Sequence, residues 1–206
     1  MIKNIIFDWS GVIKDSVLDY LVIANKIFKQ FGAKEISLEE LQEEWRQPYL
    51  VFYRKYLPNI TVEEESTAYR KAISESSEAR QYEGISDLIK KFKKSGIKLF
   101  VVSSDNSDTL LPEVKSFGLE NVFDEIIFGV HDKEEGAREI VEANNLDREK
   151  TIFIGDSNHE IEVGKKLEIK TAAVTWGFSS ESRLKSENPV FLIHSLEELE
   201  KSIFKK

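Results

Sequence analysis

Four short apolar segments, far apart in the sequence, are each followed by a polar side chain that could take part in phosphoryl chemistry. In chain order they offer a carboxylate, a hydroxyl, an amine and a second carboxylate. If the segments are neighbouring parallel strands of one open sheet, their carboxyl ends meet at the crevice where such sheets bind ligands. The residues that would share this pocket are Asp8, Ser103, Lys133 and Asp156.

The pattern of apolar residues predicts the elements that would bring these side chains together. From about residue 85 onward, segments with helical periodicity alternate with short apolar runs typical of buried strands. Such alternation produces a parallel sheet with helices on both faces, so we expect an α/β, Rossmann-like core of three layers. Helices are expected at residues 86–95, 109–117, 136–145 and 160–167, and strands at 98–103, 151–155 and 169–175.

Residues 15–82 differ in character, because they show helical patterns and no convincing strand. Those patterns lie at residues 17–31, 37–56 and 62–77. Ser37, followed three residues later by Glu40, resembles a capping box at the start of a helix. We therefore expect a small all-helical cap domain at 15–82, inserted into an α/β core domain made of residues 1–14 and 83–206.

The composition limits the classes of protein to which the chain can belong. Its 206 residues, 41% of them hydrophobic, suffice for one sizeable core and a small second domain. The chain has no cysteine, so any metal must be held by oxygen or histidine ligands. A net charge of -8 argues against a nucleic-acid partner, and an acidic protein that binds phosphate usually recruits a divalent cation.

Hydropathy indicates where the protein works. No apolar run approaches the roughly 18 residues of a membrane span. The first strand is preceded neither by a basic region nor by an apolar signal segment. We therefore expect a cytoplasmic protein without a membrane partner.

In order and spacing, the polar residues resemble the four motifs of the haloacid dehalogenase superfamily of phosphotransferases, in particular its phosphoglycolate-phosphatase-like branch with a helical cap. Asp8 matches the nucleophile of the first motif, Ser103 the hydroxyl of the second and Lys133 the lysine of the third. Asp156 with Glu160 matches the paired acids of the fourth motif, and the likeness covers nearly the whole chain. The resemblance implies that the helical insertion is a mobile lid, which would exclude water from the crevice.

The resemblance also implies a mechanism. Asp8 would attack phosphorus and form an aspartyl phosphate during hydrolysis of a small phosphorylated metabolite. Mg²⁺ would be held by Asp8, Asp156 and the backbone carbonyl of Ser10, with Glu160 as a direct or outer ligand. Lys133 would neutralise charge between the nucleophile and the phosphoryl group. Neither the substrate nor the oligomeric state is indicated.

Further residues are candidates for contact with the substrate. Ser103 and backbone amides would bind the phosphoryl oxygens, and Ser104 could take over the role of its neighbour. In the cap, Arg54 could meet an anionic substrate, the alternative being a solvated charge on a helix. His159, inside the fourth motif, is interpreted as a solvent-facing loop residue.

One position departs from the family's phosphatases, which generally carry a second aspartate two residues after the nucleophile. Ser10 stands there, and a serine cannot supply, near neutral pH, general acid–base catalysis worth about 10²- to 10⁴-fold. We therefore expect hydrolysis to be slow. The sequence Asp-Trp-Ser-Gly also resembles phosphonoacetaldehyde hydrolases, which cleave carbon–phosphorus bonds with a cap lysine as Schiff base, and Lys55 is the nearest candidate for that lysine. A third alternative is a catalytically impaired member that binds phosphate or a protein partner.

Overall fold

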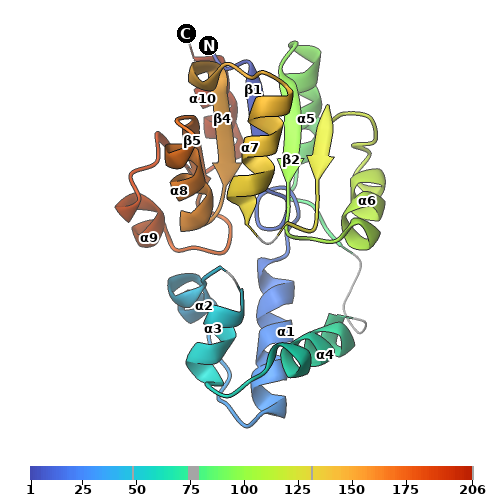
Figure 1. The fold of residues 1–206 in the computed structure, drawn as a ribbon, viewed down its shortest axis with the longest axis vertical. Coiled ribbons are helices and arrows are strands. Elements are labelled where there is room, and N and C mark those ends of the chain that lie inside the picture. Colours follow the sequence, from blue (N-terminus) through green and yellow to red (C-terminus); the bar gives the residue numbers. More distant parts are fainter. Residues whose placement is uncertain (48, 74–78, 131, 206) are drawn as a thin grey trace.

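The computed structural model describes residues 1–47, 49–73, 79–130 and 132–205, and a parallel sheet forms its centre (Figure 1). Within these residues the strands are β1 (Asn4–Phe7), β2 (Lys98–Val102), β3 (Glu125–Ile127), β4 (Thr151–Gly155), β5 (Lys170–Val174) and β6 (Phe191–Ile193). Their order is β3-β2-β1-β4-β5-β6, with every pairing parallel. Phe7 of β1 is in register with Val101 of β2 and Ile154 of β4, so these three strands end at nearly the same level.

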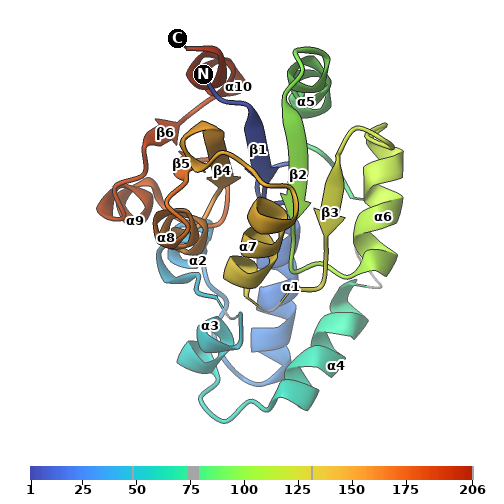
Figure 2. The same ribbon diagram turned by 45° about the horizontal axis from the view of Figure 1, so that its top comes forward.

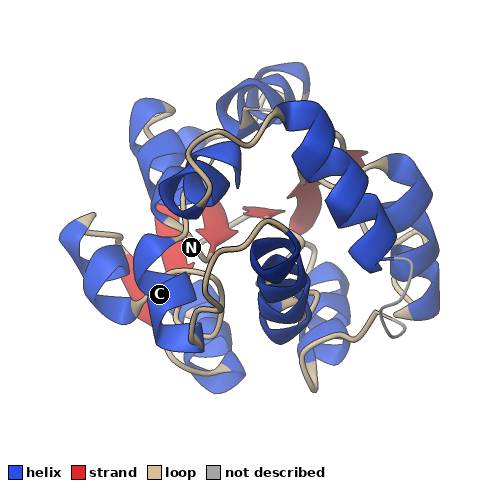
Figure 3. Ribbon diagram, turned by 90° about the horizontal axis from the view of Figure 1, so that it is seen from below, coloured by secondary structure: helices blue, strands red, loops and turns tan. Residues whose placement is uncertain are grey.

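Helices cover both faces of the sheet, which confirms the predicted three layers (Figure 3). They are α5 (Ile85–Lys94), α6 (Ser107–Ser116), α7 (Lys133–Ala143), α8 (Asn158–Lys166), α9 (Glu181–Ser186) and α10 (Leu196–Phe204). On one face, Ile5 and Phe7 pack in an apolar cluster with α5, α6 and α10, and on the other Ile6 packs with α7 and α8. Successive strand residues point to opposite faces, so the uninterrupted run of apolar residues in β1 is what a sheet covered on both sides requires.

The insertion after β1 is helical, as predicted. It contains α1 (Val17–Gln30), α2 (Leu38–Glu44), α3 (Tyr49–Tyr56) and α4 (Val62–Ile73), which lie together beyond the carboxyl ends of the strands (Figures 1 and 2). These helices share an apolar cluster that includes Phe28, Phe52 and Tyr53, and Phe178 of the core domain joins it. A separate cluster supports residues 15–82 as a cap domain, and those limits remain a prediction.

The expected helix over 37–56 is in fact two helices. Ser37 does begin a helix, since its Oγ accepts the backbone N–H of Glu40 at 3.1 Å, but α2 ends after Glu44. Trp45 has an extended backbone with ψ 130°, and its ring stacks on Phe178 of the core domain at 4.8 Å between ring centroids. Pro48 explains the interruption, since it has no N–H to donate to the carbonyl of Glu44, and a helix over 37–56 would be broken at this point. The expected helix over 62–77 is present from Val62 to Ile73, and residues 74–77 lie outside the described residues.

None of the helices in the described part of the chain combines the length and the apolar character that crossing a lipid bilayer requires.

Candidate active site

Asp8 directly follows β1 and is buried, with 4% of its surface exposed. Its Oδ1 accepts the backbone N–H of Trp9 at 2.7 Å, and its Oδ2 lies 2.9 Å from Nζ of Lys133. The indole of Trp9 points away into the core, where it donates to Glu113 at 2.7 Å and stacks on Phe117. The turn after β1 is thereby anchored in the core, which fixes the carboxylate at the end of the sheet.

Lys133 is the first residue of α7 and is 2% exposed, so it is not one of the chain's surface lysines. Its ammonium lies between two carboxylates, 2.9 Å from Asp8 and 2.5 Å from Oε1 of Glu160. Asp132 caps the helix by accepting the N–H of Glu134 at 2.8 Å. The start of α7 therefore places Lys133 beside the carboxylate of Asp8, which follows β1.

The paired acids lie at the carboxyl end of β4. Oδ2 of Asp156 accepts the backbone N–H of Phe178 at 2.6 Å. Oε2 of Glu160 accepts both the N–H and the hydroxyl of Ser157, at 2.9 and 2.6 Å, in a capping box at the start of α8. The expected helix-start role and the expected site role of Glu160 thus coexist, because one of its oxygens caps the helix and the other faces Lys133.

Three carboxylates converge as a cation site would require. Asp8, Asp156 and Glu160 each offer an oxygen, and these oxygens lie within 4.8 Å of one another. The loops around them pack closely: a Cβ placed on Gly11 would lie 2.1 Å from Oδ2 of Asp156, and one on Gly177 would lie 2.2 Å from the same atom. A hard divalent cation takes carboxylate oxygens as ligands. The residues present therefore fit Mg²⁺. Sequence reasoning missed the role of Gly11 and Gly177, which leave room for the Asp156 carboxylate.

Burial and charge act against each other in this cluster. Burial raises the pKa of Asp8 to about 6, although the ammonium of Lys133 opposes the shift. Burial and then the charge of Asp8 raise the pKa of Asp156. Burial would also raise the pKa of Glu160, but Lys133 and the bonds from Ser157 outweigh it and lower that pKa. One ammonium thus faces three acids, and a bound cation would relieve the remaining repulsion.

Replacing Lys133 with methionine should destabilise the metal-free protein, because Asp8 and Glu160 would keep their burial and lose their counter-charge. Removal of one partner from a buried ion pair typically costs about 3–5 kcal/mol. Urea unfolding in the presence of a chelator should show this loss, and Mg²⁺ should reduce it. Lys166→Met is the control, since that lysine is exposed and pairs with Glu134 on the surface at 2.8 Å, an interaction worth about 0–1 kcal/mol. Equal unfolding energies for the two variants would contradict the assignment of Lys133 as the internal counter-charge.

The loop after β2 brings hydroxyl groups to the same edge of the sheet. Ser103 is 1% exposed, and its Oγ accepts the N–H of Asp105 at 3.0 Å, so its own proton remains available to a phosphoryl oxygen. Ser104 is exposed. Ser10 donates its hydroxyl to Oδ2 of Asp105 at 2.7 Å. Sequence reasoning missed Asp105, although its place two residues after Ser103 was a signal that could have found it.

The basic residues expected near the substrate are placed differently from one another. Arg54 is exposed on α3, and no hydrogen bond or ion pair joins it to the site residues that the structure describes. Lys55 pairs with Glu44 at 2.6 Å, and 48% of its side chain is exposed. His159 lies 3.4 Å from Asp132 and shares with Arg46 a small hollow of about 100 Å³ between cap and core. The structure therefore brings Arg46, rather than Arg54, close to the paired-acid motif.

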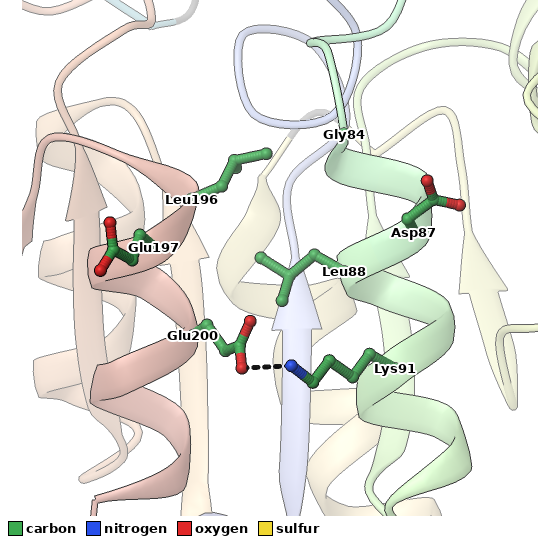
Figure 4. A pocket seen from close by; sticks show the side chains of 7 residues that line it. All are labelled: Gly84, Asp87, Leu88, Lys91, Leu196, Glu197 and Glu200. Carbon is green, nitrogen blue, oxygen red and sulfur yellow. Dashed lines mark hydrogen bonds and ion pairs between the residues drawn. The ribbon is translucent and has the colours of Figure 1, made fainter.

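A larger surface hollow of about 370 Å³ lies between α5 and α10 (Figure 4). Leu88 and Leu196 face each other across it, and Lys91 forms an ion pair with Glu200. None of the predicted site residues lines it. The site described above is therefore separate from this hollow.

Comparison with known proteins shows which family the chain belongs to. The family model described as haloacid dehalogenase-like hydrolase matches residues 5–174. Pyrophosphatase PpaX of Halalkalibacterium halodurans is 25% identical in an alignment 207 residues long, which covers 96% of this chain and 95% of that protein. Phosphoglycolate phosphatase 1 of Pseudomonas aeruginosa is 23% identical over 96% of this chain and 78% of its own length. The crystal structure of a predicted phosphatase from Clostridium acetobutylicum superposes with a TM-score of 0.85 at 23% identity, with both chains fully covered. The chain is an enzyme that belongs to the haloacid dehalogenase-like hydrolase family.

Proposed function

We propose that the protein is a Mg²⁺-dependent phosphatase that hydrolyses a small phosphorylated metabolite through an aspartyl phosphate on Asp8. The observation that carries this proposal is the position of Asp8 at the end of the central strand. There it touches Lys133 at 2.9 Å and shares one cluster with Asp156 and Glu160. The names of the two relatives, a pyrophosphatase and a phosphoglycolate phosphatase, support phosphate ester or anhydride hydrolysis.

The described residues supply the steps of such a reaction. A carboxylate oxygen of Asp8 attacks phosphorus, the bond to the leaving oxygen breaks, and water then attacks phosphorus and frees the carboxylate. Lys133 holds Asp8 in place and offsets negative charge, while the Ser103 hydroxyl donates to a phosphoryl oxygen. Mg²⁺, held by Asp8, Asp156, the Ser10 carbonyl and Glu160, would neutralise charge between carboxylate and phosphate.

A panel of substrates tests the proposal. Phosphate release should be measured with Mg²⁺ from pyrophosphate, phosphoglycolate, sugar phosphates, acetyl phosphate and p-nitrophenyl phosphate. Turnover of at least one of these, with incorporation of phosphate into the protein, is the expected result. The absence of phosphate release from every compound would leave a catalytically impaired, phosphate-binding protein as the better description.

The same panel can include phosphonoacetaldehyde, which tests carbon–phosphorus cleavage. That reaction needs a lysine that forms a Schiff base with the substrate. Lys55, the nearest candidate, is half-exposed and pairs with Glu44 at 2.6 Å. No bond or ion pair joins it to the described residues of the phosphoryl site. We therefore expect no acetaldehyde to be formed.

Asp105 supplies a carboxylate next to the position where Ser10 replaces the usual acid. It comes from the loop after β2, beside β1, and its Oδ2 is 2.7 Å from the Ser10 hydroxyl. Asp8, Asp156 and Glu160 are already engaged as nucleophile and cation ligands. Asp105 is accordingly the carboxyl that donates a proton to the leaving oxygen and later accepts a proton from the attacking water.

Asp105→Asn tests this role, because the amide oxygen can still accept the bond from Ser10 but cannot transfer a proton. First-turnover release of the leaving group from alkyl phosphates should fall by about 10²- to 10⁴-fold, and first-turnover release of p-nitrophenol should fall much less, since p-nitrophenolate needs no protonation. Adding Ser10→Asp should restore much of the loss. Asp108→Asn, which changes an exposed acid of α6, is the control. Equal losses on both substrate types would instead indicate that Asp105 is structural.

A further inference from the structure

Phe178 contacts both Asp156 in the core domain and the apolar cluster of the cap. Its backbone N–H donates to Oδ2 of Asp156 at 2.6 Å. Its ring, on the other side, is buried in the apolar cluster of the cap. There it stacks on Trp45 at 4.8 Å between centroids and 29° between planes, and meets the edge of Tyr20 at 5.4 Å. In the described part of that cluster, Phe178 is the buried member that comes from the core domain.

Polar contacts at the end of α2 hold the cap on the same core segment. Gln42 donates its side-chain amide to the carbonyl of Gly177 at 2.9 Å. The carbonyl of Gln42 accepts the N–H of Ser180 at 3.1 Å and a guanidinium N–H of Arg183 at 3.0 Å. The cap is thus docked on both sides of Phe178, by its neighbours through hydrogen bonds and by the ring through apolar packing.

The same segment is closely packed against Asp156. A Cβ on Gly177 would lie 2.2 Å from Cβ and Oδ2 of Asp156, so the backbone of this loop is in direct contact with the acid. The N–H of Ser179 also donates to the carbonyl of Asp156 at 3.2 Å. Closely packed contacts of this kind transmit displacement, because interiors have little free volume. A shift of the loop therefore shifts either the carboxylate or its hydrogen-bond donor.

We propose that Phe178 is a positioning residue that couples docking of the cap to the geometry of Asp156, so that cap closure and divalent-cation binding favour each other. The proposal rests on the proposed cation site and does not depend on which phosphate is hydrolysed. With the cap docked, the Phe178 ring is held and its N–H fixes Oδ2 of Asp156. With the cap undocked, the ring loses Trp45 and Tyr20, and the loop is free to release the carboxylate. Coupling between two equilibria is reciprocal, so a bound cation must also favour the docked cap.

Direct binding of Mn²⁺, measured by electron paramagnetic resonance without turnover, tests the coupling. Phe178→Leu keeps the backbone donor and removes the ring, and Trp45→Leu removes the partner ring from the cap without touching the cation site. Both variants should bind Mn²⁺ about fivefold or more weakly than the wild type, the lower end of usual coupling strengths. The double variant should bind Mn²⁺ no more weakly than the single variant with the lower affinity, since either change breaks the same contact between Phe178 and the cap.

Phe28→Leu is the matched control. Phe28 is a buried aromatic of the same cluster whose recorded ring partners, Phe52, Tyr53 and Tyr56, all belong to the cap. It should lower the stability of the cap and leave Mn²⁺ affinity within about twofold of the wild type. Loss of affinity in all three variants alike would indicate general loosening and would overturn the proposal.

Hydrogen exchange in α2 and α3 provides the reciprocal measurement. Mn²⁺ should slow exchange there in the wild type and in Phe28→Leu, and should not do so in Phe178→Leu. Folded Phe178→Leu and Trp45→Leu proteins with wild-type Mn²⁺ affinity would refute the coupling. A protein that shows the coupling but hydrolyses no phosphate would refute the proposed activity alone. Failure of the wild type to bind Mn²⁺ would refute both the coupling and the cation-dependent activity.

Discussion

Asp8→Asn should abolish phosphate release, with a loss of about four to six orders of magnitude, the scale found when a covalent nucleophile is removed. An amide has nearly the same shape as the carboxylate and can still accept the Trp9 N–H, but its oxygen is a poor nucleophile. The variant should stay folded, because it removes a buried negative charge. Burial disfavours that charge, which is why it raises the pKa of Asp8 to about 6. Phosphate release and phosphoenzyme trapping should both be at background.

Two controls make the Asp8→Asn experiment decisive. Asp108→Asn changes an exposed acid in the first turn of α6 and should keep wild-type turnover. Thermal unfolding of Asp8→Asn should occur at or above the wild-type temperature, which separates a lost nucleophile from a lost fold. A stable variant that still forms phosphoenzyme would show that another group attacks phosphorus.

Removal of divalent cations should reduce hydrolysis to background, and Mg²⁺ should restore it. Three buried carboxylates converge within 4.8 Å while Lys133 supplies one counter-charge, so an incoming phosphate would meet uncompensated negative charge. The rest of the protein does not supply the missing positive charge, because the net charge of the chain is -8. Activity should be measured after dialysis against a chelator and then over a range of Mg²⁺ concentrations.

Asp156→Asn extends the cation experiment to a single ligand. The amide keeps the size that the Gly11 and Gly177 loops accommodate, and it removes one negative charge from the site. The Mg²⁺ concentration for half-maximal activity should rise by at least an order of magnitude, as expected when one charged ligand is lost. Full wild-type activity in excess chelator would contradict the cation mechanism.

The cap and the proposed cation site lie together at the carboxyl ends of the strands (Figure 1). The cap contributes Trp45 and Tyr20 to the packing of Phe178, and the core contributes Asp8 and Asp156 to the cluster below it. The hollow lined by Arg46 and His159 lies between cap and core, beside the paired-acid motif.

The sequence by itself determined the parallel core and its polar strand ends. Apolar runs of four or five residues, separated by helical periodicity, permit few arrangements other than a sheet covered on both faces. In such a sheet, residues that follow neighbouring strands must meet at one edge. Asp8, Ser103 and Asp156 therefore lie where their order in the chain predicted, and the insertion after β1 is helical because its apolar residues repeat with helical spacing.

Sequence spacing alone left other features undecided. Lys133 is one of many lysines in the chain, and only burial between Asp8 and Glu160 distinguishes it from a surface charge. The apolar residues over 37–56 repeat with helical spacing, yet α2 ends at Glu44, because Pro48 cannot donate the backbone bond that would continue the helix. Local periodicity reports which face of a segment is apolar, and it does not report what covers that face.

Only the tertiary structure decided which distant groups touch. The bond between Ser10 and Asp105 spans 95 positions of sequence, and the bond from Phe178 to Asp156 spans 22. Such contacts depend on how loops from neighbouring strands cross the end of the sheet, which no local pattern encodes. Backbone geometry and packing set these distances, so the chemistry that depends on them became visible only when the folded chain brought the loops together.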